Sequence, residues 1–195
     1  MIKVGITGGI GSGKSVVSSL IAMNGIPIYT ADTESKRLSD SSPVIRRKLV
    51  ALYGNSLYVN NVLDRKRLAS IIFSDEKALK SVNEIIHPVV QKDFQAWIKQ
   101  QKTNICVIES AILFESRFDK IVDITLLVYA PVGLRLTRVM ERDGANEADI
   151  MKRMNRQMPD ELKRKQADFV IINDEVEALL PQVDQFLKLL PLQKK

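Results

Sequence analysis

Nine consecutive residues near the start of the chain, Thr7-Gly8-Gly9-Ile10-Gly11-Ser12-Gly13-Lys14-Ser15, fit the phosphate-binding pattern G-x-x-x-x-G-K-S. The glycines permit backbone angles that a side chain would forbid, so consecutive N–H groups can turn inward around a phosphate. Lys14 would reach the β- and γ-phosphates of a nucleotide, and the Ser15 hydroxyl would ligate Mg²⁺. The stretch is therefore typical of a P-loop that binds a nucleoside triphosphate.

The residues on either side of this loop favour the same interpretation. Ile2–Ile6 is an apolar, β-branched run typical of a buried strand, and Val16, Val17, Leu20 and Ile21 recur at helical spacing. The alternative, a glycine-rich turn with a solvated lysine, does not require a strand before the loop and a helix after it. Nucleotide contacts are predicted at Gly8, Gly9, Gly11, Ser12, Gly13, Lys14, Ser15 and Val16.

Two acidic residues follow predicted strands and could take part in phosphoryl transfer. Asp32 comes just after Ile26–Tyr29, at the sheet edge where ligands bind, and could accept the proton of an attacking hydroxyl. The alternative is a helix N-cap. Glu109 ends the strand Ile105–Ile108 and could hold Mg²⁺ through water, with structural ion pairing as the alternative.

Basic residues are concentrated between residues 135 and 165. They could form a lid that closes over ATP and presents arginines to its phosphates, or a solvated, salt-bridged helix surface. Arg138 and Arg142 are four residues apart and would share a helix face, which makes them the favoured phosphate ligands. His87, the only histidine, is either a packed or capping residue or a ligand of a substrate phosphate.

Alternating strands and helices predict an α/β fold with a parallel sheet. The further strands are Ile124–Val128 and Phe169–Ile172, and a final helix is expected over Val176–Leu190. The long segment Thr33–Lys102 is predicted to be mostly helical and to project as a subdomain. Its expected helices are Glu34–Leu38, Pro43–Tyr53, Arg65–Phe73 and a long one over Asp75–Lys102 that is interrupted at His87-Pro88.

The composition narrows the class of protein. With 195 residues, of which 45% are hydrophobic, the chain can form one full core. The net charge of +6 suits an anionic ligand, but the basic residues alternate with acidic ones and lack aromatic stacking partners, which argues against nucleic acid. A single cysteine, no signal-peptide pattern at the start and no membrane-length apolar run lead us to expect a cytoplasmic protein.

Motifs along nearly the whole chain resemble the dephospho-CoA kinase family. Besides the P-loop, the matching segments are Ala31-Asp32, Ile86-His87-Pro88, Leu113-Phe114-Glu115, Arg138, Arg142-Asp143, Arg153, Gln157, Ala167-Asp168-Phe169-Val170-Ile171 and Asn173. The sequence departs from the family pattern at Val16, Thr30 and Ala111, where threonine, aspartate and proline are usual. None of these departures removes Lys14, Ser15 or Asp32.

The resemblance implies a P-loop kinase-like fold with a five-stranded parallel sheet in the order 2-3-1-4-5. It implies a core of residues 1–32, 103–130 and 167–195, a helical CoA-binding subdomain of residues 33–102 and a lid of residues 131–166. The implied reaction is Mg²⁺- and ATP-dependent phosphorylation of the ribose 3′-hydroxyl of dephospho-CoA. Asp32 would be the base, His87 would contact substrate, and Arg138, Arg142 and Asn173 would lie around ATP. A monomer is expected.

Two other functions remain open at this stage. One is a kinase of another small hydroxylated substrate or nucleotide, and the other is a P-loop regulator or nucleic-acid-dependent ATPase. The sequence lacks the D-x-x-G and N-K-x-D segments of a GTPase.

Overall fold

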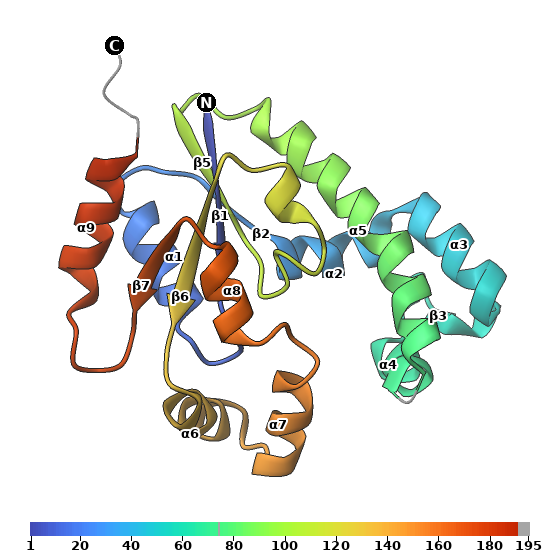
Figure 1. Cartoon of the computed structure of the whole chain (residues 1–195). Coiled ribbons are helices and arrows are strands. Elements are labelled where there is room, and N and C mark those ends of the chain that lie inside the picture. Colours follow the sequence, from blue (N-terminus) through green and yellow to red (C-terminus); the bar gives the residue numbers. More distant parts are fainter. Residues whose placement is uncertain (74, 191–195) are drawn as a thin grey trace. The chain divides into compact units, whose positions relative to one another are not determined.

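The computed structural model describes residues 1–73 and 75–190, which divide into two compact units. Of the described residues, the first unit comprises 1–30 and 101–190 and is built on a parallel sheet (Figure 1). Its strands are β1 Ile2–Thr7, β2 Ile28–Thr30, β5 Ile105–Glu109, β6 Ile124–Tyr129 and β7 Phe169–Ile172. They lie in the order β2-β5-β1-β6-β7, which is the order 2-3-1-4-5 that the family resemblance implied.

The register of the sheet brings the ends of three strands into one row. Glu109 at the end of β5 pairs with Thr30 of β2 on one side and with Ile6 of β1 on the other. The P-loop leaves the sheet directly after β1, so Glu109 and the P-loop belong to the same sheet edge. This is the edge where open α/β sheets bind ligands.

The helices of the first unit lie around the sheet (Figure 1). They are α1 Lys14–Ala22, α6 Val132–Asp143, α7 Glu147–Met154, α8 Asp160–Gln166 and α9 Leu179–Leu189, with a 3-10 turn at Phe118–Lys120. Val17 and Ile21 of α1 and Val183 and Phe186 of α9 pack into one buried cluster with apolar residues of the strands. Burial of this cluster fixes the start of α1, and with it the P-loop, against the sheet.

The second unit, residues 31–100, is mainly helical. It contains α2 Ala31–Ser41, α3 Pro43–Tyr53, α4 Arg65–Phe73 and α5 Glu76–Ile98, a 3-10 turn at Asn55–Leu57, and a hairpin of β3 Tyr58–Val59 and β4 Val62–Leu63. No helix in the described part of the chain is long and apolar enough to cross a membrane.

Three predictions about the elements are wrong. Helix α5 continues through His87 and Pro88, because buried side chains on both sides of the proline, among them Ile86 and Val90, hold the helix in place. The hairpin was not expected in a region predicted to be helical. Helix α9 begins at Leu179, three residues later than the expected start at Val176.

Candidate active site

The P-loop has the backbone geometry that phosphate binding requires. Gly13 is the N-cap of α1 and has a left-handed conformation, with φ 90°. Gly11 has φ 80°, and a Cβ at this position would lie 2.5 Å from the carbonyl oxygen of Arg135. A side chain is therefore excluded at Gly11 by both backbone strain and lack of space. The positive end of the α1 dipole begins directly after Gly13 and favours an anion beside the loop.

Ser15 lies next to a buried carboxylate. Its Oγ is 3.3 Å from Oε1 of Glu109, whose exposed fraction is only 8%. Thr7 Oγ1 and Ser12 Oγ are also buried and have no hydrogen-bond partner within the described structure. These hard oxygen donors at one sheet edge suit Mg²⁺, which takes one or two protein ligands and fills its other positions with water and phosphate oxygens.

Lys14 begins α1 and Val16 lies in its first turn. The Lys14 ammonium group is 3.4 Å from the carbonyl oxygen of Gly9, so it lies over the loop. The N–H group of Val16 donates to the carbonyl oxygen of Gly13 at 3.0 Å, and its side chain is 53% exposed. Val16 thus makes a helical backbone bond and presents an apolar surface beside the loop.

Arg138, Asn173 and Ser12 form a chain of contacts to the P-loop. Arg138 donates through Nη1 to the backbone carbonyl of Asn173 at 3.2 Å and through Nη2 to its side-chain oxygen at 3.4 Å. The Asn173 amide then donates to the carbonyl oxygen of Ser12 at 2.8 Å. The structure therefore brings together three residues for which ATP contact was predicted and that are up to 161 positions apart in sequence.

Arg142 lies apart from this chain of contacts. It is exposed and donates to the Asp143 carboxylate at 2.7 and 3.1 Å, and Arg153 donates to the same carboxylate at 3.0 Å. The hydrogen bonds from both arginines lower the pKa of Asp143 well below its usual value, and the bond to Asp143 raises the pKa of Arg142.

Asp32 and His87 belong to the helical unit. Asp32 is the second residue of α2, two positions past the end of β2, and its side chain is exposed. His87 lies in α5 and is half-buried, and burial lowers its imidazole pKa below the ordinary 6.5. Cys106 of β5 is buried, and burial raises the pKa of its thiol to about 11.

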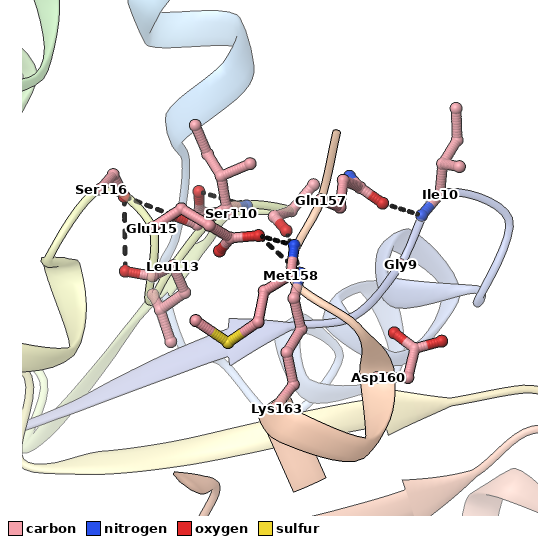
Figure 2. Close-up of polar contacts among 12 residues, drawn as sticks. Gly9, Ile10, Ser110, Leu113, Glu115, Ser116, Gln157, Met158, Asp160 and Lys163 are labelled. Atoms are coloured by element: carbon pink, nitrogen blue, oxygen red, sulfur yellow. Dashed lines mark hydrogen bonds and ion pairs between the residues drawn. The ribbon is translucent and has the colours of Figure 1, made fainter. Parts of the chain in front are cut away.

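Two residues that contact the P-loop were not predicted to do so. Arg135, in α6, has an exposed fraction of 4% and donates through Nε to the carbonyl oxygen of Ile10 at 2.9 Å. Gln157, between α7 and α8, accepts from the N–H group of Ile10 at 2.9 Å (Figure 2). Arg135 also pairs with Asp160, and burial lowers its pKa.

Glu115 and Lys163 brace the segment that carries Gln157 (Figure 2). Glu115 Oε1 accepts from the N–H group of Met158 at 2.7 Å and lies 3.3 Å from Nζ of Lys163. Lys163 is fully buried and donates to the carbonyl oxygen of Ala111 at 2.7 Å, and burial lowers the pKa of its ammonium group. Glu115 of the Leu113-Phe114-Glu115 motif therefore has a structural role, because it helps to hold the segment that carries Gln157.

The five-stranded parallel sheet, its strand order and the P-loop between β1 and α1 define the chain as a P-loop kinase. Shikimate kinase from Acinetobacter baumannii shares this fold, with a TM-score of 0.56 over 97% of this chain and 92% of that one, at 17% identity. Within this class, the chain belongs to the dephospho-CoA kinase family, whose sequence model matches residues 2–178.

Individual relatives agree with the family assignment. Dephospho-CoA kinases from Porphyromonas gingivalis and Bacteroides fragilis are each 44% identical to this chain, over 96% and 97% of its length and 94% and 93% of theirs. The crystal structure of TT1252 from Thermus thermophilus is 34% identical, with a TM-score of 0.82 over 96% of this chain and 94% of that one.

Proposed function

We propose that this protein transfers the γ-phosphoryl group of ATP to the ribose 3′-hydroxyl of dephospho-CoA, giving CoA and ADP, the last step of coenzyme A biosynthesis. Membership of the dephospho-CoA kinase family supports the substrate. The observation that carries the chemistry is the P-loop at the sheet edge, with the Ser15 hydroxyl 3.3 Å from the buried Glu109 carboxylate.

Backbone amides of the P-loop and the start of α1 would hold the phosphates, and Lys14 would neutralise charge on the transferring group. Ser15 would ligate Mg²⁺ directly, and Glu109 would orient a metal-bound water. Mg²⁺, when bound, would neutralise part of the negative charge of the nucleotide phosphates. Arg138 and Asn173, which contact each other and the P-loop at Ser12, would border the nucleotide.

Asp32 would act as the base. As the 3′-oxygen of the ribose bonds to the γ-phosphorus, its proton passes to the Asp32 carboxylate, and the bond from phosphorus to the bridging oxygen breaks to release ADP. A second proposed substrate contact is His87. Because burial lowers its pKa, His87 is neutral at pH 7 and would contact a substrate phosphate as a hydrogen-bond donor rather than as a cation.

The segment of residues 131–166 would form the lid. Arg142 and Arg153 share Asp143 in the present arrangement, so closure over ATP would require Arg142 to exchange this carboxylate for phosphate. Asp143 would then stay paired with Arg153, and the carboxylate would not be left without a cation. This exchange gives the exposed Arg142 a route to the nucleotide.

The experiment that tests the proposed function compares acceptors in the presence of Mg²⁺ and ATP. Dephospho-CoA, adenosine, nucleoside monophosphates and single-stranded DNA are supplied separately, and ADP formation is measured. We expect turnover with dephospho-CoA and little with the others. Faster turnover with another small acceptor would reassign the substrate, and ATP hydrolysis stimulated by DNA alone would contradict the kinase function.

A further inference from the structure

Both backbone groups of Ile10, at the crest of the P-loop, are held by side chains from the segment of residues 131–166. The N–H group donates to Gln157 Oε1 and the carbonyl oxygen accepts from Arg135 Nε, each at 2.9 Å. A Cβ at Gly9 would collide with the guanidinium group of Arg135, so this glycine makes room for the arginine. The crest is therefore held by one side chain from α6 and one from the loop between α7 and α8.

The segment that carries Gln157 is also connected to the other end of the P-loop, through Glu115 and the residues before it. The next residue, Met158, donates its N–H group to Glu115. Glu115 lies six positions after Glu109, which is the last residue of β5. Glu109 in turn contacts Ser15 at the base of the loop. One short segment, residues 109–115, thus supports both the crest and the base of the phosphate cradle.

The Ile10 side chain packs against a buried apolar cluster formed by residues of α6 and α7. A pocket of about 490 Å³ borders Arg135 and Gln157, and its walls include Met151, Met154 and Met158. Methionine side chains are flexible and adapt to changes in their surroundings. The directional bonds from Arg135 and Gln157 therefore add to the packing by fixing the backbone groups of Ile10.

We propose that Gln157 is a positioning residue for phosphoryl transfer, which acts by holding the N–H group of Ile10 and thereby the neighbouring amides of the P-loop. A glutamine suits this place because its side-chain carbonyl oxygen can accept the bond from the Ile10 N–H group. Arg135 fixes the carbonyl side of the same residue. The inference rests on the proposed function, since it assumes that the loop holds ATP.

The effect on rate follows from the geometry of the cradle. Gln157 holds the N–H side of Ile10, so loss of this bond lets that side of the crest shift while Arg135 still holds the carbonyl side. Displacement of a positioned group by about 1 Å can lower a rate by about 10²-fold. Loss of the Gln157 bond should therefore lower kcat while changing KM for dephospho-CoA little.

The test compares Gln157→Leu, which lacks an acceptor, with Gln157→Glu, which keeps one, and with Gln185→Leu at an exposed glutamine of α9 as a control. Amide hydrogen exchange at Ile10 reports the bond itself, and kcat and KM for both substrates report its consequence. We expect Gln157→Leu to speed exchange at Ile10 and to lower kcat about 10- to 100-fold. Gln157→Glu should restore protection and stay within about fivefold of the wild-type kcat, because a carboxylate oxygen accepts the same bond. Gln185→Leu should match the wild type.

Four results would overturn the proposal. They are an unprotected Ile10 amide in the wild type, a Gln157→Leu variant with near-normal kcat, a Gln157→Glu variant as slow as Gln157→Leu, and an equal loss of kcat in the Gln185→Leu control. If Gln157→Leu does not fold, Gln157→Ala removes the acceptor without adding apolar bulk and takes its place. A wild-type protein without kinase activity would instead refute the proposed function, so the two failures are distinguishable.

Discussion

Two side chains, Lys14 and Asp32, have separate roles in the mechanism of phosphoryl transfer that we propose. Lys14 stabilises the charge on the phosphoryl group, and Asp32 accepts the proton of the attacking hydroxyl. The P-loop glycines and Lys14 could be predicted from sequence because the whole phosphate-binding loop lies in one short stretch of the chain. Nine consecutive residues, Thr7–Ser15, contain the loop, and the flanking strand and helix are visible in the pattern of apolar residues.

Arg135 and Gln157 could not be predicted as P-loop contacts. Gln157 and Ile10 are 147 positions apart, and Arg135 is one of several arginines in a segment of mixed charge. The adjacent glycines hint that some side chain approaches the crest. Only the packing of α6 against the loop determines which one it is.

Replacing Lys14 by alanine should abolish measurable transfer. Removal of one donor to a developing charge costs about 10²- to 10³-fold in kcat. Lys14→Arg should not restore the rate, because the planar guanidinium cannot occupy the position of the compact ammonium group. Steady-state kinetics, with circular dichroism to establish that both variants are folded, measure this. Near-normal turnover of Lys14→Ala would remove the lysine from the mechanism.

Asp32→Asn should lower kcat by about 10²- to 10⁴-fold, the usual contribution of a general base, and leave ATP affinity nearly unchanged. Glu34 in the first turn of the same helix provides the control. If Asp32 served only to stabilise the start of α2, Asp32→Asn and Glu34→Gln would both lower Tm and neither would lower kcat. Titration calorimetry with ATP, combined with kinetics, separates these outcomes.

His87 should make stability depend on pH. Its folded-state pKa lies below the unfolded value of 6.5, so the unfolded chain binds the proton more readily. The stability conferred by the neutral imidazole is fully present above pH 6.5 and is lost as the pH falls below that value. The fall in Tm between pH 7.5 and 5.5 should be smaller in His87→Gln than in the wild type. Parallel curves for the two proteins would contradict the assigned direction of the shift.

Among the elements, those with strong periodicity were predicted well. The bounds of α3, α4 and β7 match the sequence-based expectation, because each has clear apolar spacing and a recognisable start or end. The hairpin of β3 and β4 was missed because each strand has only two residues. A signal was present in Asn60-Asn61, which both adopt left-handed angles, with φ 49° and 67°, as two-residue hairpin turns require.

Helix α5 was predicted to break at Pro88 because proline removes a backbone hydrogen bond from a helix interior. Tertiary packing outweighs this cost in the structure. Pro88→Ala should therefore raise the free energy of unfolding by about 1–3 kcal/mol. Pro43→Ala is the matched control, since Pro43 is at the start of α3, where proline is favourable. Denaturant titration measures both, and an equal change in the two variants would contradict the explanation.

At the scale of the whole molecule, the chain combines a phosphate-binding sheet with a separate helical unit. Sequence reasoning predicted a helical subdomain between the second and third core strands, and the structure divides the chain into residues 31–100 and the remainder. The strand order came from the family resemblance, because periodicity along a chain contains no information about which parallel strands are neighbours. Strand pairing is set by contacts such as Ile6 with Glu109, which are far apart in sequence.

The most direct measurement of the central claim is the identity of the product. Purified protein is incubated with Mg²⁺, ATP and dephospho-CoA, and phosphorus NMR follows the new phosphate ester. We expect a phosphomonoester on the ribose 3′-oxygen in amounts equal to the ADP formed, and no ester when Mg²⁺ is withheld. ADP released without an ester, or phosphate attached to a different hydroxyl, would contradict the account.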